Sequence, residues 1–534
     1  GDGKPVFLML GVHHAREWPS GEHAIEFAHD LVRNFGADER ITGLLRRVRV
    51  LVVPVVNVDG FNVSREALVD LGDLGRALGG ETGYSLTTLA DPFLAYKRRN
   101  CRLLGTLPAI PGLCALAPSR LTGVDLNRNY GKFWGGPGAS ALPLWDTYRG
   151  AAPFSEPETR AIRELVAQRQ VTVLITNHTF SNLVLRPPGL ASQGAPPDES
   201  AMKALGDAMA EANGYTSQQA WELYDTTGTT EDWSYAATGG YGFTFEIGPN
   251  EVHPPFEEVV AEYLGTTEAA RGRGGNREAF LRGLEAAADP RHHAVITGRA
   301  PAGTTLRLHK EVTTGSSPVR PFETDLVGDP IGLEGDVIVT RDRLTSELVV
   351  GPSHAFTWHV NPSTRPAVVA AGGTEAWTLS CLGPDGRVVA EREVVVGRGE
   401  RVDLGQACSP ALLAPASAAD RRVRAAISRR TVRAERRGRA VTVVVSCPRA
   451  ARARCAGTLE LATRVRSRGR ARTVVLGRKR YALRAGTRRT VRVVIRRAQR
   501  RLLRSGRTLR VRATAIGADD TRRTVTIRVR PARR

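Results

Sequence analysis

The sequence predicts an α/β domain at the front of the chain, followed by two all-β, sandwich-like domains. Over residues 1–288, short apolar runs alternate with longer segments whose apolar residues recur every three to four positions. That alternation is typical of a mixed, largely parallel sheet flanked by helices. Beyond residue 290, β-type runs separated by Gly and Pro replace the helical pattern. A chain of 534 residues has the length of two to four domains.

The elements of the α/β domain follow from their own patterns. Four continuous apolar runs predict buried strands at 6–10, 48–56, 171–175 and 242–246. Five amphipathic stretches predict helices at 21–35, 156–169, 198–213, 255–264 and 277–288. Asp289-Pro290 ends the last helix, because proline does not continue one. The domain is therefore expected to span residues 1–288.

Two β regions are expected after this domain. Residues 291–410 contain short runs rich in β-branched and aromatic residues, which predict an antiparallel sandwich. A linker rich in Pro, Ala and Ser follows at 411–421. In residues 422–534, Val, Ile and Leu alternate with Arg at a period of two, which is typical of half-buried strands with one solvated face. A second small sandwich is expected there.

Positive charge is concentrated in the last quarter of the chain. The net charge is +22, but residues 421–534 hold 38 Lys and Arg against 4 Asp and Glu, and the first 420 residues carry −12. The arginines are expected either to form a solvated face or to bind a polyanionic surface such as wall polymers, extracellular DNA or anionic lipid. Tyr481 is the only aromatic residue of this region, so base stacking and sequence-specific recognition of nucleic acid are not expected.

The six cysteines fall in local pairs: Cys101 with Cys114, Cys381 with Cys408, and Cys447 with Cys455. None has the C-x-x-C spacing of a structural zinc site. One pair in each predicted domain favours disulfides and an oxidising compartment, so secretion is expected; the alternative is six thiols in a cytosolic protein. No apolar run approaches the ~20 residues that cross a bilayer, so no transmembrane segment is expected.

Two adjacent histidines follow the first predicted strand, in the stretch GVHHAREW. His14 and Glu17 form an H-x-x-E pattern. His13 would place Arg16 in the glutamate's position, so His13 is expected to be a bystander whose replacement changes little. An imidazole and a carboxylate suit Zn²⁺, and a catalytic zinc needs three protein ligands and an open position for water. His178 is a candidate third ligand, because it ends another predicted strand and catalytic groups gather at such ends.

Five segments, in order, resemble motifs of the zinc carboxypeptidase family, which contains carboxypeptidases A and B: GVHHAREWPS, GVDLNRNY, ITNHTF, LYDTTGTTEDW and FTFEIG. The resemblance covers residues 5 to about 265. It implies one Zn²⁺ per chain, bound by His14, Glu17 and His178. It weakens the alternative in which His178 is only a hydrogen-bonded residue at the end of a strand.

The resemblance also implies how hydrolysis would proceed. Zinc would acidify a bound water, and Glu246 would take the proton and pass it to the leaving amine. Arg98 would polarise the scissile carbonyl and stabilise its oxyanion, although a one-residue shift of YKRRN would select Lys97 instead. Asp125 corresponds to the carboxylate that orients the first histidine, here His14.

An exopeptidase must also bind a free C-terminal carboxylate. The resemblance assigns this task to Asn127 and to Arg128, whose guanidinium suits bidentate hydrogen bonds. It makes Tyr224 the phenol that closes over the substrate, and Arg16 a further substrate-binding residue. Glu231, just before Asp-Trp, would lie at the floor of the side-chain pocket and favour C-terminal Arg or Lys. A broad or apolar preference is the alternative.

Two features depart from the family's pattern. Its catalytic domains normally have additional strands before the H-x-x-E strand, and we expect this chain to lack them or to be truncated before them. Phe180 stands where the family often has a tyrosine, which removes a hydrogen bond from the substrate cleft without touching the metal site.

The sequence thus predicts a secreted zinc-dependent carboxypeptidase that acts on the C-termini of peptides or proteins. One alternative is a related enzyme that cleaves cell-wall peptide stems containing D-amino acids, although DLNRN together with Tyr224 favours an ordinary α-carboxylate. Another is a non-catalytic binding protein on a truncated peptidase fold. The complete ligand set and Glu246 argue against that alternative.

Overall fold

The computed structural model describes residues 2–66, 96–102, 122–319 and 335–408, followed by 425–428, 431–448, 455–467, 470–504, 508–517 and 522–531. They belong to two compact units, Gly1–Leu413 and Ala414–Arg534. The first unit contains the predicted α/β domain and the β region after it. The second contains the arginine-rich region. The predicted linker at 411–421 lies outside the described residues.

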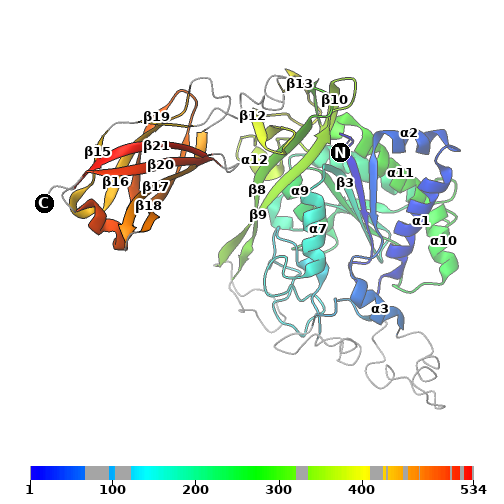
Figure 1. Cartoon of the computed structure of the whole chain (residues 1–534). Helices are drawn as coiled ribbons and strands as arrows, with labels where there is room; N and C mark the ends of the chain where they lie inside the picture. Colours follow the sequence, from blue (N-terminus) through cyan, green and yellow to red (C-terminus); the bar gives the residue numbers. More distant parts are fainter. Residues whose placement is uncertain are drawn as a thin grey trace, which may run out of the picture. The chain divides into compact units, whose positions relative to one another are not determined.

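The α/β part is built on a six-stranded sheet with the strand order β2-β1-β3-β6-β4-β5. Figure 1 shows β3 of this sheet and the helices around it. All neighbouring strands are parallel except β4 and β6, which confirms the prediction of a mixed, largely parallel sheet. The strands are β1 (Val6–Leu10), β2 (Arg49–Val53), β3 (Val171–His178), β4 (Leu183–Arg186), β5 (Thr216–Gln219) and β6 (Tyr241–Glu246).

Each face of this sheet is covered by helices and has its own core. Along β1, Phe7 and Met9 belong to a cluster with residues of α1, α2, α8 and α11, whereas Leu8 and Leu10 belong to a second cluster with α7 and α9. A strand buried on both faces needs apolar side chains at every position, which explains the continuous apolar run. The helices are α1 (Trp18–Asn34), α2 (Glu39–Arg47), α3 (Val58–Glu66), α7 (Pro157–Ala167), α8 (Glu199–Asn213), α9 (Thr230–Thr238), α10 (Phe256–Leu264) and α11 (Gly275–Ala288).

The β part of the first unit contains two sheets, β10-β7-β13 and β12-β11-β8-β9. Residues of both sheets, including Trp358 and Trp377, form one hydrophobic core. β13 pairs with β7 in parallel, so the expected antiparallel arrangement is wrong at this edge. The parallel pairing arises because the chain crosses over to β13 from β12 in the other sheet. The sandwich description stays a prediction. The elements are β7 (Ala294–Arg299), β8 (Thr305–Val319), β9 (Asp336–Val349), β10 (Ala355–Val360), α12 (Pro366–Ala370), β11 (Trp377–Leu382), β12 (Val388–Val394) and β13 (Arg401–Gln406).

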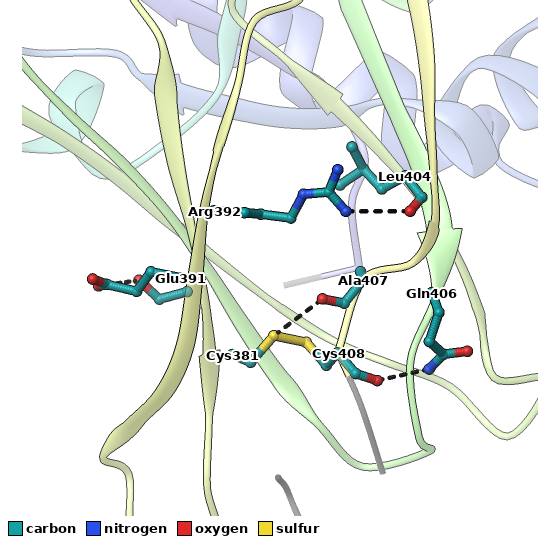
Figure 2. The surroundings of a disulfide bond; sticks show 8 residues. Cys381, Glu391, Arg392, Leu404, Gln406, Ala407 and Cys408 are labelled. Atoms are coloured by element: carbon teal, nitrogen blue, oxygen red, sulfur yellow. Dashed lines mark hydrogen bonds between the residues drawn. A yellow bond between two sulfur atoms is a disulfide. The ribbon is translucent and has the colours of Figure 1, made fainter. Parts of the chain in front are cut away.

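A disulfide joins these two sheets. Cys381 of β11 is bonded to Cys408, two residues after β13, with 6.1 Å between their Cα atoms (Figure 2). Beside it, the guanidinium of Arg392 on β12 donates a hydrogen bond to the carbonyl of Leu404 on β13 (3.2 Å). The predicted pair is therefore confirmed, as is Cys447–Cys455 in the second unit. Cys101 is also disulfide-bonded, and its predicted partner Cys114 lies outside the described residues.

Polar contacts connect the β part to the α/β part within the first unit. The amide of Asn361 donates to the carbonyl of Val171 at the start of β3 (2.7 Å). Arg398 forms two 2.8 Å hydrogen bonds to the carboxylate of Asp198, just before α8. These contacts explain why residues on both sides of position 288 belong to one compact unit. A domain boundary at that position stays a prediction.

The second unit also contains two sheets, β14-β16-β19 and β15-β21-β20-β17-β18 (Figure 1). Along β21, Ile527 and Val529 are buried and Arg528 and Arg530 are exposed, as the period of two predicts. In the described residues of both units, no helix is long and apolar enough to cross a membrane. The strands are β14 (Ala426–Ile427), β15 (Val432–Arg433), β16 (Ala440–Ser446), β17 (Cys455–Ser467), β18 (Arg470–Leu483), β19 (Arg488–Val494), β20 (Leu509–Gly517) and β21 (Arg522–Arg530).

Candidate active site

His14, Glu17 and His178 meet at the carboxyl edge of the six-stranded sheet. His14 follows β1, Glu17 precedes α1, and His178 is the last residue of β3. Because β1 and β3 are parallel neighbours, the residues after them emerge at the same edge. Glu17 Oε1 lies 2.7 Å from His14 Nδ1, and Glu17 Oε2 lies 2.9 Å from His178 Nδ1. The structure therefore brings the three predicted ligands together.

The donor atoms of these residues fit a zinc ion. Each residue is buried and offers one ligand atom, and these atoms all lie within 4.8 Å of one another. The two Nδ1 atoms are 3.1 Å apart, so a proton or a cation is needed to keep their lone pairs from repelling. At bond lengths of about 2.0–2.2 Å, tetrahedral zinc ligands lie roughly 3.3–3.5 Å from one another. Small shifts of these side chains are enough to accommodate Zn²⁺.

Asp125 and Arg98 form the layer behind His14. Asp125 Oδ1 lies 3.2 Å from His14 Nε2, and Asp125 Oδ2 accepts a 2.8 Å hydrogen bond from Arg98 Nε. Burial alone would raise the pKa of Asp125, but Arg98, His14 and Arg128 hold it well below its ordinary value. Asp125 is therefore an anion suited to orient the imidazole of His14.

The geometry also distinguishes Arg98 from Lys97. A terminal nitrogen of Arg98 is 3.9 Å from Glu17 Oε1, which places the guanidinium beside the metal-ligand cluster. Lys97 instead donates a hydrogen bond to the hydroxyl of Thr122 (3.0 Å). Of the two candidates for polarising the scissile carbonyl, Arg98 is the one that faces the site.

Glu246 ends β6 next to His178. The two residues are register partners on parallel strands, so both reach the carboxyl edge of the sheet. Burial raises the pKa of Glu246 to about 8, with Glu17 acting in the same direction and His178 and Arg98 acting against it. A carboxyl group with this pKa exchanges protons readily near neutral pH, which suits a general acid-base role.

Asn127 and Arg128 lie on η3 (Leu126–Arg128), a short 3₁₀ helix that Asp125 caps by accepting a hydrogen bond from Asn127 N (3.0 Å). The amide oxygen of Asn127 accepts hydrogen bonds from the backbone and hydroxyl of Thr230, and its amide nitrogen donates to no other described residue. Arg128 is only 2% exposed and donates from Nε to Gly138 O (2.7 Å). Both side chains are thus held in place by protein contacts.

The loop that holds Arg128 is supported by the β part of the first unit. Ser317 on β8 donates from its hydroxyl to Phe133 O (2.8 Å) and from its backbone to Trp134 O (3.1 Å). A Cβ at Gly136 would lie 2.4 Å from the Ser317 hydroxyl, so only glycine allows this approach. The β region therefore contacts the segment between Arg128 and its acceptor Gly138.

Glu231 lies on α9, against β6. A Cβ at Gly242 would come within 2.8 Å of the Glu231 backbone, so this glycine lets the helix approach the strand. Glu231 is 2% exposed, and its Oε2 has no hydrogen-bond partner among the described residues. Burial, with the charge of Glu231, raises the pKa of the neighbouring Asp232 to about 7. Glu231 is thus a buried carboxylate with one unsatisfied oxygen.

The remaining predicted residues are more exposed. Tyr224, between η5 (Ala220–Glu222) and α9, is 49% exposed, as is compatible with a mobile phenol. Arg16 donates from Nη1 to Tyr96 O (3.3 Å) and lies 3.7 Å from Asp146. Phe180, two residues after His178, is 40% exposed.

His13 is not part of the metal-ligand cluster, but it is no bystander. It is fully buried, and its Nδ1 is hydrogen-bonded to Thr176 Oγ1 (3.0 Å), which also lies 3.3 Å from His178 Nε2. Its Nε2 contacts the hydroxyls of Tyr130 (2.9 Å) and Thr230 (3.0 Å). That replacing His13 changes little stays a prediction. The sequence interpretation considered only the chain neighbours of His13, whereas these partners come from distant segments.

The open α/β sheet has a buried cluster of two histidines and one glutamate at its carboxyl edge. Zinc ligands of this kind are typical of the metallopeptidase class. A family model described as zinc carboxypeptidase, peptidase M14, matches residues 1–269, about half of the chain. The chain belongs to the zinc carboxypeptidase family.

Individual relatives are similar over about half of the chain. Carboxypeptidase A2 of Rattus norvegicus is 30% identical over 256 residues, which are 46% of this chain and 52% of that protein. Carboxypeptidase B of Bos taurus is 28% identical over 256 residues, with the same coverage. The chain thus spans about half the length of the curated relatives it matches. A crystal structure of thrombin-activatable fibrinolysis inhibitor is 22% identical, with a TM-score of 0.41, over 54% of this chain and 63% of that one.

Proposed function

We propose that the protein is a zinc-dependent carboxypeptidase that hydrolyses the C-terminal bond of peptides or proteins. The observation that carries the proposal is the juxtaposition of the His14, Glu17 and His178 cluster with Glu246, at the edge of the sheet where Arg128 is held. These residues would supply three metal ligands, a proton acceptor and an anchor for the substrate carboxylate. Membership of the family supports the same activity.

His14, Glu17 and His178 would hold the metal, which supplies Lewis-acid activation of water when it is bound. Glu246 accepts a proton from the attacking water and then delivers it to the amine nitrogen as the peptide bond breaks. Arg98 donates hydrogen bonds to the carbonyl oxygen as negative charge develops there, and Asp125 keeps its guanidinium in position.

Asn127 and Arg128 would bind the terminal carboxylate of the substrate. The amide hydrogens of Asn127 remain available, and Arg128 is oriented by its bond to Gly138 O. Tyr224 would cover the bound residue by moving from its exposed position, and Arg16 would contact the substrate at the rim of the site. Fixing the carboxylate places the preceding peptide bond next to Glu246, which makes the enzyme an exopeptidase.

Glu231 would select the terminal side chain. A carboxylate that is 2% exposed and has an unsatisfied oxygen gains most from a cationic partner. A substrate guanidinium or ammonium supplies that partner, whereas leucine or phenylalanine leaves the charge unpaired. We therefore propose a preference for C-terminal Arg or Lys.

We further propose that the protein acts outside the cell, where its disulfides persist. The cell-wall peptide stem remains a second candidate substrate, because a stem with a free α-carboxylate would occupy Asn127 and Arg128 in the same way. A non-catalytic binding role is disfavoured, since burial and ion pairing hold a complete set of ligands beside a proton acceptor.

A pair of matched peptides tests the proposal, one with a free and one with an amidated C-terminus. Arg128 should bind only the free carboxylate, so amidation should abolish cleavage of the last bond. Equal cleavage of both peptides would contradict exopeptidase action. A third peptide ending in D-alanine separates the two substrate candidates, because selective cleavage of this peptide would favour the cell-wall stem.

A further inference from the structure

A groove lined by arginines lies on the second unit, independently of the peptidase site. Its volume is about 330 Å³, and its lining residues are Thr431, Thr508, Arg510, Arg528 and Arg530. These residues come from the segments around β15, β20 and β21, which are neighbours in the five-stranded sheet (Figure 1). All five side chains are exposed.

The strand register brings like charges directly opposite one another. Arg510 on β20 faces Arg528 on β21, and Arg433 on β15 is the register partner of Arg530. Directly opposite residues on antiparallel strands such as β20 and β21 have Cβ atoms about 4.5–5.5 Å apart, so the like charges of Arg510 and Arg528 repel and cost stability. Arg528 and Arg530, two residues apart on the same strand, are separated by roughly 6.7 Å along it.

No carboxylate compensates this charge within the described part of the unit. The ion pairs there are Arg478 with Glu460 and Arg492 with Glu435, and neither pair involves a groove residue. Arg478 and Arg492 lie on β18 and β19, away from the register positions that form the groove. The groove thus combines three guanidinium groups of like charge with two hydroxyls, an arrangement that a bound anion would stabilise.

We propose that this groove binds a linear polymer that carries phosphate groups. Guanidinium groups form bidentate, charge-assisted hydrogen bonds with phosphate oxygens, and the hydroxyls of Thr431 and Thr508 add neutral donors. Arg510 and Arg528 are one strand apart across the sheet, and Arg528 and Arg530 are two residues apart along β21. This row of guanidinium groups suits an extended chain that carries successive negative charges. Such a polymer would tether the peptidase to a phosphate-rich surface.

The surroundings of the groove favour a polymer over a membrane or a nucleobase. The exposed large apolar side chains in the described part of this unit are Val444 and Val494, and both lie on the other sheet. The groove therefore has no large apolar group to insert into a bilayer. Tyr481, the only aromatic residue of the region, is buried, so no ring is available for a base to stack on.

The test uses the full chain and fluorescently labelled inorganic polyphosphate, with binding measured by anisotropy at several salt concentrations. In the groove variant, Arg510→Gln and Arg528→Gln are combined. The control combines Arg488→Gln and Arg489→Gln, which removes the same charge from exposed positions on β19 of the other sheet. Thermal unfolding shows whether both variants remain folded.

The groove variant should bind polyphosphate at least about tenfold more weakly than wild type, whereas the control should change by less than about threefold. For the groove variant, the slope of log affinity against log salt concentration should become less negative by roughly one to two, as expected for the loss of about two phosphate contacts. Equal losses of affinity in both variants would show that net charge alone explains the binding, and this would overturn the proposal. Absence of polyphosphate binding to the wild type would overturn it too.

Two further probes distinguish other anions. Single-stranded DNA should bind no more tightly than polyphosphate of equal charge, because the groove offers no stacking surface. Vesicles of anionic phospholipid should bind in a manner insensitive to the groove substitutions. If only the vesicles show loss of binding in the groove variant, the ligand is a lipid surface and the polymer proposal is wrong.

Discussion

Glu17 and Asp125 in the first unit are almost fully buried, and each contacts His14 and Arg98. Glu17 also contacts His178. Arg510 and Arg528 in the second unit are exposed, face each other and have no carboxylate partner in the described residues. Burying an ion costs several kcal/mol unless partners compensate it, whereas an exposed ion costs little. The partners of a buried charge therefore restrict what the site does much more strongly than those of an exposed charge.

This difference explains why the two proposals rest on different observations. At the candidate active site, the identities and distances of the partners support the proposal of a metal and of proton transfer beside it. In the arginine-rich unit, the composition alone is equally compatible with a solvated face. Only the register, which places arginines opposite one another around a groove, favours a ligand.

The largest effect is expected at Glu246, the proposed proton acceptor. Glu246→Gln should lower kcat by about 10²–10⁴-fold while zinc content stays at one per chain, because an amide does not accept the proton of water. Glu257→Gln, a change of the same kind on exposed α10, should leave kcat unaltered. Steady-state kinetics and metal analysis measure both quantities. Near-normal turnover in Glu246→Gln would remove its assigned role.

A smaller effect is expected at Glu231, the buried carboxylate that we propose selects the terminal side chain of the substrate. Wild type should have a higher kcat/KM for a peptide ending in Arg than for one ending in Leu, and Glu231→Gln should reduce this ratio by at least about tenfold. The reason is that the neutral amide no longer needs a cationic partner. If the ratio favours Leu in wild type, or survives the substitution, Glu231 does not select the side chain.

Buried histidines should make the first unit sensitive to acid. His293 is fully buried, with its Nε2 2.7 Å from His359 Nδ1, and burial lowers its pKa to about 3, with His359 and His292 acting in the same direction. The unfolded chain binds this proton below about pH 6.5, so stability present at neutral pH is lost as the pH falls. Between pH 7.5 and pH 5 the loss should be roughly 2 kcal/mol.

Tryptophan fluorescence isolates this effect, because all seven tryptophans belong to the first unit. Urea unfolding at the two pH values should show a smaller acid loss in His293→Gln than in wild type. An equal acid loss in wild type and variant would show that the folded protein accommodates the proton on His293.

The smallest effect concerns the support of Arg128 by the β region. Ser317→Ala removes one hydrogen bond to Phe133 O, which is worth about 1 kcal/mol. KM for a free C-terminus should rise by about two- to fivefold while kcat changes less, because Arg128 is less well positioned. Ser353→Ala, an exposed change in the turn before β10, serves as the control. If kcat falls and KM is unchanged, β8 does not act through the carboxylate anchor.

Much of the fold could be predicted because its elements carry strong patterns. β1 is apolar at every position since both its faces are covered, and all five predicted helices form within a few residues of their expected limits. The sequence analysis missed β5, because Thr216–Gln219 is a short polar edge strand. It also missed α9, because polar and apolar residues of this helix are buried alike and the sequence therefore has no amphipathic period there.

The candidate site could be predicted only as far as its motifs allowed. H-x-x-E and a histidine at the end of a strand are visible in the sequence, but their meeting depends on the adjacency of β1 and β3. The choice of Arg98 over Lys97 needed the position of Asp125. The contacts of His13 with Thr176, Tyr130 and Thr230 join segments more than 100 residues apart, and no local pattern predicts them.

The most direct test of the account is release of the C-terminal amino acid from a peptide by the full chain, measured before zinc removal, after chelation and after zinc is restored. We expect one Zn²⁺ per chain, loss of activity with the metal and recovery on its return. His178→Ala should have neither the zinc nor the activity. Undiminished hydrolysis by the metal-free protein, or stoichiometric zinc in His178→Ala, would contradict the assignment of His14, Glu17 and His178 as the metal centre of a carboxypeptidase.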